Sequence, residues 1–477
     1  MTVVAGITSY GAYIPPTRLP LSVIGGGRAK QGGPEKAVAW NDEDSVTMAV
    51  TAGVNCLRGL ERSAVDGVMF ASTTYAFREK QAAALIAKAL DLPRGIRTAD
   101  FSGSLRAGTA ALRSAVDAVT AGSARTVLVV ASDSRMGAPG SGLERNGGDG
   151  AVAFLIGDTD AVASISDSCA VSDEIVDLWR GDGDRFVHSW EDRFVIQEGF
   201  TPNMIEAATG VMGQLGLSAS DYASVCLYAP DARSHAGVAR GLQATREQLQ
   251  DALFGRLGNT GVAFAPMQLA AALETARSGD RILVVNYGDG AEALSFQVTD
   301  SIEKLEDRRG VSWHLARRRA ISSYDKYLKA RSLDSREWET GGDPGLSATV
   351  HFRERDEDIS FCGQKCLQCS AVQFPNQRIC ESCFAKDDFE KARLSDRIGK
   401  VVTYTFDFFF PTPDPPTVVT VTDIDGARVH LQLVNVMPDQ TCIGLPVEFE
   451  FRRIHEAGGR PNYYWKGSPL PDTDETN

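Results

Sequence analysis

Two separate stretches of this 477-residue chain carry the same pattern of residues. Residues 118–135, AVTAGSARTVLVVASDSR, and residues 272–290, ALETARSGDRILVVNYGDG, each combine an expected helix, a turn of small residues, an arginine and a strand rich in Val, Ile and Leu. A second apolar strand follows each copy, at 150–158 and 291–299. Internal self-similarity is the sequence signature of a duplicated architecture. The repeat therefore predicts an α/β domain over residues 1–300, built as two related βαβαβ halves.

The composition narrows the class of protein further. No apolar run approaches the roughly 20 residues that span a bilayer, so we expect no membrane partner. The first residues, MTVVAGITSYGAYIPP, follow an apolar strand pattern without the basic head of a secretory signal, which favours the cytoplasm. A formal net charge of −13 argues against broad nucleic-acid binding, because such binding depends on Lys and Arg neutralising phosphates.

Beyond residue 300 the pattern changes three times. Residues 301–350 carry dense charge of both signs and predict a solvated connecting helix, which GGDPG at 341–345 would end. Residues 351–392 hold a cluster of cysteines. Residues 393–477 contain short alternating strands, with DIDGAR typical of a hairpin turn, and predict a small β-barrel followed by a tail.

The cysteine cluster has the spacing of a structural zinc site. It consists of two C-x2-C pairs separated by ten residues, formed by Cys366, Cys369, Cys380 and Cys383. Four thiolates complete the tetrahedral coordination of Zn²⁺ and leave no open position for a substrate. Cys362 would be a fifth thiolate that such a site cannot use. We therefore expect a structural zinc that supports a module too small to fold well alone.

Specific stretches resemble known families. Residues 355–470, with FPNQRICESC and IGLPVEFEF, resemble the zinc-ribbon and OB-fold proteins that accompany acyl-CoA thiolases, acyl-CoA aldolases and archaeal-type hydroxymethylglutaryl-CoA synthases. The first 300 residues resemble the thiolase fold, in its hydroxymethylglutaryl-CoA synthase and ketoacyl synthase III branch. The stretches that carry this likeness are GITSYGAYIPPTRL, EDSVTMAV, GGDGAVAFLIGD and GNTG. The resemblance implies a coenzyme A thioester as substrate and a homodimer.

The same resemblance shows which catalytic residues are replaced. Enzymes of this branch use a cysteine nucleophile, a histidine and an asparagine or glutamate. The family motifs place the cysteine at Leu105, the histidine at Tyr228 and the glutamate at Thr73, whereas the asparagine is kept as Asn259. A leucine cannot be acylated, so covalent acyl transfer by the usual route is not expected.

Chemistry without a covalent intermediate fits this altered site. Aldol or retro-aldol reaction of an acyl-CoA needs an acid–base group and a polar cradle for the enolate. Tyr228 would be the acid–base group if its pKa were lowered, and Tyr75 is another candidate for that role. Asn259 and backbone donors would form the polar cradle for the enolate. Leu105 and Thr73 would line the substrate site, and Gly288 and Gly290 the oxyanion region.

Three further readings stay open. Ser104 could serve as an acyl nucleophile after a one-residue shift of register, although neither His188 nor His235 is an obvious base for it. The domain could also catalyse another non-covalent acyl-CoA reaction, or be a noncatalytic scaffold.

Arg106 is either a helix cap or a cation aimed at the thioester or the phosphates of coenzyme A.

Overall fold

The computed structural model describes residues 5–30, 32–305, 308–333, 347–410, 412–457 and 460–470. It divides into two compact units. The first contains Met1–Ala39, Asp44–Ala87 and Leu92–Tyr324, and the second contains Trp40–Glu43, Lys88–Asp91 and Asp325–Asn477. None of the described helices combines the length and hydropathy needed to cross a membrane.

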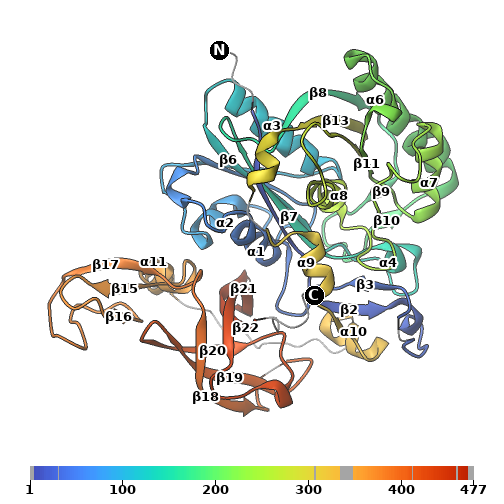
Figure 1. The fold of residues 1–477 in the computed structure, drawn as a ribbon. Helices are drawn as coiled ribbons and strands as arrows, with labels where there is room; N and C mark the ends of the chain where they lie inside the picture. Colours follow the sequence, from blue (N-terminus) through green and yellow to red (C-terminus); the bar gives the residue numbers. More distant parts are fainter. Residues whose placement is uncertain are drawn as a thin grey trace. The chain divides into compact units, whose positions relative to one another are not determined.

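The first unit is built around a nine-stranded sheet with the order β11-β12-β13-β8-β1-β7-β6-β4-β5 (Figure 1). Its strands are β1 (Gly6–Tyr13), β4 (Gly67–Ala71), β5 (Arg97–Phe101), β6 (Thr126–Asp133), β7 (Gly150–Gly157), β8 (Ala163–Ser172), β11 (Ser224–Leu227), β12 (Arg281–Tyr287) and β13 (Gly290–Val298).

The sheet confirms the predicted duplication. On one side of the central β1–β8 pair, β13 is antiparallel to β12, which is parallel to β11. On the other side, β7 is antiparallel to β6, which is parallel to β4. Each repeated stretch is therefore a helix followed by two antiparallel strands, as the sequence pattern predicts.

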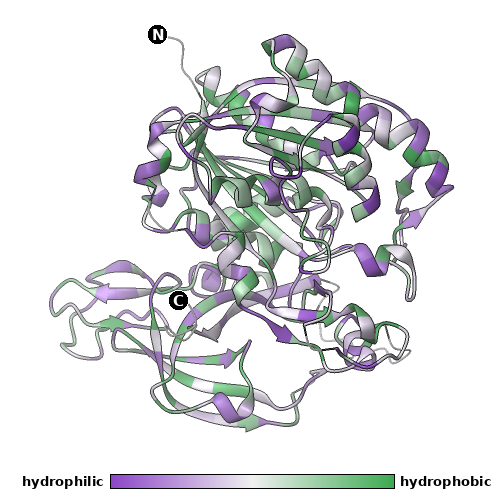
Figure 2. Cartoon of the chain, turned by 45° about the vertical axis from the view of Figure 1, so that its right-hand side comes forward, coloured by the Kyte–Doolittle hydropathy of each residue, from purple (hydrophilic) through white to green (hydrophobic). Residues whose placement is uncertain are grey.

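Helices cover the two halves of this sheet. The principal ones are α1 (Ser45–Cys56), α2 (Ala82–Ala89), α3 (Ala107–Thr120), α6 (Thr201–Leu215), α7 (Ala232–Gly241) and α8 (Phe264–Leu273). α3 packs against β4, β6 and β7 through its buried positions Ala111, Leu112, Ala115 and Val116, which recur at the helical period. α8 is apolar almost all round, because it contacts strands of both halves: β1 and β7 as well as β11 and β12. In Figure 2 hydrophobic, green segments run along strands of this sheet.

Shorter elements complete the first unit. They are β2 (Thr17–Pro20), β3 (Glu35–Ala37), β9 (Leu178–Trp179), β10 (His188–Ser189), α4 (Gly142–Asn146), α5 (Asp192–Phe194), α9 (Val311–Ala316) and β14 (Arg319–Ala320). β9 and β10 form a small hairpin, and β14, β2 and β3 form a three-stranded sheet.

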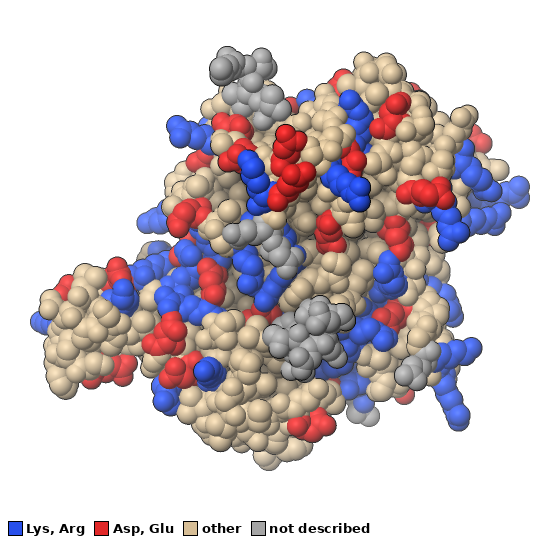
Figure 3. Space-filling view, viewed as in Figure 1, with Lys and Arg blue, Asp and Glu red and all other residues tan. Residues whose placement is uncertain are grey.

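On the face drawn in Figure 3, acidic and basic side chains are interspersed.

The prediction of one solvated connecting helix over residues 301–350 is wrong. α9 buries Val311 and His314, and β14 pairs with β2, so the part of this segment up to Tyr324 belongs to the first unit. The charged residues of this segment suggested a solvated helix, but some of them form ion pairs within the fold. Arg318, for example, forms an ion pair with Glu35. The expected break at 341–345 lies outside the described residues.

The second unit holds the cysteine ribbon and the barrel. Its C-terminal segment starts within α10 (Tyr324–Ala330), whose first residue belongs to the first unit, and continues with α11 (Ala348–Asp358). The ribbon is formed by β15 (Cys362–Cys366), β16 (Val372–Gln373) and β17 (Phe389–Arg393). The five-stranded closed barrel that follows contains β18 (Gly399–Asp407), β19 (Thr417–Ile424), β20 (Ala427–Leu433), β21 (Pro446–Ala457) and β22 (Arg460–Pro469).

The barrel has as many strands as an OB-fold. Its assignment to that fold stays a prediction. The turn predicted from DIDGAR connects β19 to β20. Asp425 and Gly426 both have positive φ, 53° and 97°, as a two-residue type I′ hairpin requires.

Candidate functional site

The loop that joins β5 to α3 brings Leu105 to the start of a buried helix. Arg106 is the N-cap of α3, and Gly103 turns the chain with a φ of 84°. Gly288, between β12 and β13, lies directly against this loop. A Cβ at Gly288 would come within 2.6 Å of Ser104 Oγ and 2.9 Å of the Leu105 nitrogen, so a larger residue does not fit. The two halves of the duplicated domain therefore meet at Leu105.

A cavity of about 230 Å³ opens at this meeting point. Four of the predicted site residues line it: Thr73, Ser104, Leu105 and Gly288. The remaining lining residues are Ser102, Gly103, Arg135, Asp177, Leu178, Trp179, Arg180, Val187 and Asp289. Among these described residues there is neither a cysteine nor a histidine. The cavity thus offers hydroxyls, two guanidinium groups and two carboxylates, but no thiol or imidazole.

Asp177 is the half-buried carboxylate of this cavity. Burial raises its pKa above the ordinary aspartate value, and the nearby charge of Asp289 acts in the same direction. The backbone N–H of Leu178 donates to Asp177 Oδ1 and opposes the shift. A carboxylate held in this way accepts protons more readily than one in water.

Thr73 is held by a buried carboxylate behind the cavity wall. Asp133, at the end of β6, is fully buried and accepts from the hydroxyl of Thr73 at 2.9 Å and from its backbone N–H at 2.7 Å. Ser72 Oγ, Thr74 Oγ1 and the Val262 N–H also donate to Asp133. Thr73 therefore contributes shape to the cavity, because its hydroxyl proton is already committed.

Tyr228 does not line the cavity. Its side chain is 2% exposed and packs among the rings of Phe200, Phe264 and Tyr287. Burial raises its pKa, whereas Arg135 and Asn259, which lie next to its hydroxyl, lower it. The sequence analysis required a lowered pKa for Tyr228 to act as a general base. This environment raises that pKa instead. A phenol with a raised pKa stays protonated at neutral pH and can act only as a donor.

Asn259 lies next to Tyr228, but its amide is largely engaged. Nδ2 donates to the carbonyl of Ala229 at 2.8 Å, and Oδ1 accepts from the N–H of Gly261 at 2.8 Å. An asparagine amide has two N–H donors, so one remains. Arg135 connects this pair to the cavity, since it both lines the cavity and approaches the Tyr228 hydroxyl.

Three other predicted site residues have structural contacts outside the cavity lining. The Tyr75 hydroxyl donates to the carbonyl of Phe101 at 2.8 Å, and burial raises its pKa. The Arg106 guanidinium donates to the carbonyl of Val171 at 2.8 Å, which fastens the start of α3 to β8. Gly290 packs so closely against the Val171 carbonyl that a Cβ would clash. These contacts explain each residue without a ligand.

The structure provides no histidine partner for Ser104 in the cavity wall. His235 is buried on α7, where burial lowers its pKa. His188 stacks on Trp179 and lies 3.3 Å from Asp184. Ser104 itself accepts a long hydrogen bond of 3.4 Å from the N–H of Arg106.

Sequence reasoning missed Arg135, Asp177 and Asp289. Arg135 follows Asp133 by two residues at the carboxyl end of β6, and Asp289 follows the carboxyl end of β12. Charged residues directly after a buried strand of an α/β sheet are a known signal for a ligand site. Asp177 has no comparable signal, because it belongs to a loop whose position depends on the fold.

The four predicted metal ligands come together in the second unit. The first cysteine of each pair opens an identical turn: the carbonyl of Cys366 accepts the N–H of Ser370 at 2.9 Å, and that of Cys380 accepts the N–H of Phe384 at 3.0 Å. Ser370 and Phe384 both have positive φ, 63° and 61°. Each turn directs its two sulfur atoms toward the other pair.

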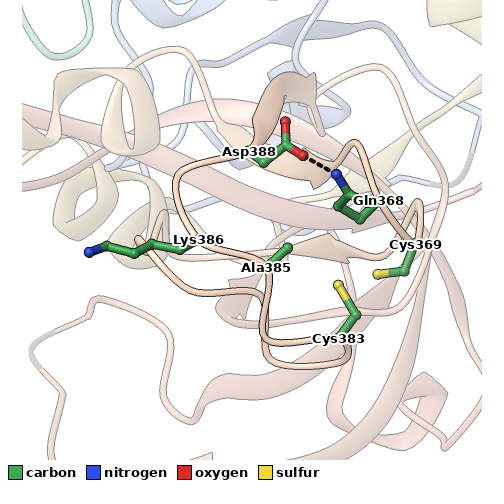
Figure 4. Close-up of a pocket in the computed structure, with 6 residues that line it drawn as sticks. All are labelled: Gln368, Cys369, Cys383, Ala385, Lys386 and Asp388. Carbon is green, nitrogen blue, oxygen red and sulfur yellow. Dashed lines mark hydrogen bonds between the residues drawn. The ribbon is translucent and has the colours of Figure 1, made fainter.

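The sulfur positions fit a tetrahedral metal ion. All four Sγ atoms lie within 4.8 Å of one another, and the Cys366–Cys383 and Cys369–Cys380 pairs are each 3.6 Å apart. Four thiolates at about 2.3 Å from a central ion would be about 3.8 Å apart. Figure 4 shows Cys369 and Cys383 beside the hydrogen bond from Gln368 to Asp388. Cys362 lies outside the group, and its thiol donates to the carbonyl of Ser360.

Comparison with known proteins gives a consistent set of relatives. The chain is 30% identical over 340 residues to the hydroxymethylglutaryl-CoA synthase of Methanocella arvoryzae, covering 68% of this chain and 96% of that protein. It is 32% identical over 335 residues to the corresponding synthase of Pyrococcus furiosus, covering 68% and 95%. No family model matches the chain.

Solved structures show the same fold. An HMG-CoA synthase complexed with CoA superimposes with a TM-score of 0.64 at 19% identity, covering 72% of this chain and 94% of that one. The 3-oxoacyl-(acyl carrier protein) synthase III of Pseudomonas aeruginosa gives a TM-score of 0.56 at 21% identity, covering 62% and 98%. The sheet of the first unit is therefore a thiolase-type fold, as predicted.

Proposed function

Because the chain belongs to the hydroxymethylglutaryl-CoA synthase family, we propose that it forms or breaks a carbon–carbon bond of an acyl-CoA thioester. The relatives support the class of substrate, an acyl-CoA thioester, and do not specify the reaction type. The reaction type rests on the cavity of this chain, where Leu105 occupies the start of α3. We propose aldol or retro-aldol chemistry in which the thioester stays intact and no acyl-enzyme forms.

The cysteines outside the ribbon support this reaction type. Burial raises the pKa of Cys56 to about 12 and also raises that of Cys226, so neither gives a thiolate at neutral pH. None of the described cysteines lines the cavity. Retro-aldol cleavage needs only a base, an acid and a stabilised enolate.

We assign the acid–base roles from the environments of two groups. Asp177 is the base, because it lines the cavity as a half-buried carboxylate. We assign the acid role to Tyr228, which lies behind the cavity lining next to Arg135 and whose phenol stays protonated because burial raises its pKa. We assign Asn259 the role of positioning Tyr228 rather than of enolate donor, since its amide is bound to Ala229 and Gly261 and lies next to the Tyr228 hydroxyl. Groups whose environments separate their protonation states in this way commonly divide acid and base roles.

The pH dependence of turnover tests Asp177. A base must be deprotonated, so kcat/KM should rise with pH through the pKa of Asp177, at a midpoint above the ordinary aspartate value of about 3.9. Asp177→Asn should remove this acidic limb and most of the activity. Asp184→Asn, at an exposed carboxylate outside the cavity lining, should keep the limb. A limb of unchanged midpoint in Asp177→Asn would refute the assignment.

The direct test of the proposed function is an assay of the full chain. Acyl-CoA thioesters are supplied with aldehydes, and β-hydroxyacyl-CoA thioesters are supplied alone, and products are identified by mass spectrometry. New β-hydroxyacyl-CoA, or its cleavage, is the expected result. Ser104 lines the cavity. Transfer of the acyl group with release of free CoA would therefore favour an acyltransferase that uses Ser104. No reaction with any pair would favour the noncatalytic scaffold.

We further propose that the four-cysteine cluster holds a structural Zn²⁺. Cys366, Cys369, Cys380 and Cys383 would fill its four coordination positions. A metal with four sulfur ligands would stabilise the ribbon and take no part in the reaction. Coenzyme A would enter as part of the substrate, as the CoA complex of a structural neighbour suggests.

We also propose that the protein is a homodimer, as the family resemblance implies. Homo-oligomers with twofold symmetry are the commonest assemblies. Light scattering of the full chain at micromolar concentration should therefore give roughly twice the chain mass of 51.2 kDa. A mass equal to that of one chain would contradict this proposal.

A further inference from the structure

Arg135 is the half-buried cation of the cavity lining, whereas Arg180 is exposed. It lies two residues beyond β6 and is half-buried. No described residue forms an ion pair with it, while its sequence neighbour Asp133 is satisfied by five hydrogen bonds from Ser72, Thr73, Thr74 and Val262. A guanidinium keeps its charge at all physiological pH values. A half-buried, unpaired guanidinium in a cavity therefore favours a ligand with an anionic oxygen.

The side chain is held in place by its neighbours. Gly261 has a φ of 62°, and a Cβ at this position would come within 2.8 Å of Arg135 Cδ. The backbone of residue 261 therefore packs directly on the arginine stem. On its other side the guanidinium approaches the hydroxyl of Tyr228. Arg135 thus meets the proposed acid and the cavity at once, and its five N–H donors allow both contacts.

Three other donors of this region are already engaged. The N–H of Gly288 donates to the carbonyl of Gly290 at 2.9 Å, and one N–H of the Asn259 amide donates to Ala229. Arg180, the second arginine of the lining, is exposed and donates to the carbonyl of Thr73. Of the donors that the sequence analysis expected at an oxyanion, the N–H of Gly288 and one N–H of Asn259 are therefore committed, whereas no ion pair among the described residues engages the charge of Arg135.

We propose that Arg135 is a catalytic residue that binds the anionic oxygen formed on the acyl thioester. This inference rests on the proposed function. When Asp177 removes a proton from the acyl α-carbon, the electron pair of the C–H bond forms the enolate double bond, and the negative charge moves to the thioester oxygen. Arg135 donates to that oxygen while the C–S bond stays intact. In the cleavage direction the same oxygen receives the charge when the C–C bond breaks.

Two analogues of coenzyme A test the recognition of the anion without turnover. S-(carboxymethyl)-CoA presents a carboxylate near the enolate position, and S-(carbamoylmethyl)-CoA is its neutral counterpart. The wild type should bind the carboxylate about 10- to 100-fold more tightly, because hydrogen bonds to charged groups are strong. Arg135→Gln should abolish this preference, Arg135→Lys should restore part of it, and Arg240→Gln, at an exposed arginine on α7, should leave it unchanged. No preference in the wild type overturns the inference.

A second measurement follows the chemical step. Acetyl-, propionyl- and butyryl-CoA are incubated separately in D2O, and exchange of their α-hydrogens is followed by mass spectrometry. Arg135→Gln should slow this exchange by about 10²- to 10³-fold, as for removal of an oxyanion donor. Exchange at the wild-type rate in this variant would overturn the inference but not the proposed function. An equal loss of affinity for free CoA would overturn it too, since Arg135 would then bind a phosphate of CoA.

The two measurements separate the inference from the function on which it rests. A carboxylate preference that depends on Arg135, without exchange or turnover in the wild type, would show an anion site in a protein that lacks the proposed activity. In that case the catalytic role of Arg135 is refuted together with the proposed function.

Discussion

Removing the proposed zinc ion from the four-cysteine ribbon is expected to unfold the segment from Cys362 to Arg393 while the sheet of the first unit stays folded. The ribbon has only short strands, β15 to β17, so binding of the metal and folding are one equilibrium. For zinc-finger peptides this apparent binding free energy is about 10 to 16 kcal/mol, more than a small module can otherwise supply. Metal analysis should find one zinc per chain, and hydrogen exchange should show the ribbon losing protection after chelation.

Single cysteine variants give this prediction its control. Cys380→Ser removes a buried ligand and should lower the zinc content together with the protection of the ribbon. Cys442→Ser changes an exposed cysteine outside the cluster and should keep both. A Cys380→Ser protein with unchanged zinc content and protection would contradict the assignment.

Replacing Tyr228 with phenylalanine is expected to lower kcat by about 10²- to 10⁴-fold, the range for loss of a general acid or base. The ring contacts with Phe200, Phe264 and Tyr287 remain, so the protein should fold and bind CoA as before. Only the hydroxyl beside Arg135 and Asn259 is lost. Steady-state kinetics of the full chain, with a thermal unfolding curve for each variant, measure both effects.

Tyr222→Phe is the matched control for this variant. Tyr222 is also buried, and its hydroxyl bonds to Ser295 at 3.1 Å, away from the cavity lining. The loss of that bond should lower the free energy of unfolding by about 1 kcal/mol without a comparable change in kcat. If both variants kept wild-type kcat, Tyr228 would have no role in the reaction.

Local signals in the sequence predicted much of the fold. The repeated helix–strand–strand units became α3-β6-β7 and α8-β12-β13, because buried strands read as continuous apolar runs. The Asp425–Gly426 turn and the four-cysteine cluster followed from the special backbone and ligand chemistry of their residues. Residues 301–350 were misjudged because charge alone does not show which side chains, such as Arg318, are paired across the fold.

The candidate site was predicted only in part, for a different reason. Four residues that the sequence analysis singled out, Thr73, Ser104, Leu105 and Gly288, line one cavity, and their catalytic roles stay predictions. The family motifs also implied a catalytic place for Tyr228, but its surroundings, which raise the pKa of its phenol, come from rings on other elements. Asp177 is far from Leu105 in the sequence and meets it only in three dimensions. Proximity of this kind depends on loop packing, which a local pattern does not encode.

Intact-protein mass spectrometry during turnover tests the central claim most directly, namely carbon–carbon chemistry on an acyl-CoA without a covalent acyl-enzyme. The full chain is mixed with a substrate pair that it converts and is quenched in acid within the first turnovers. The account predicts a protein mass that stays equal to that of the free chain while products accumulate. An added acyl group, mapped by peptide analysis to Ser104 or to any other side chain of the cavity, would contradict it.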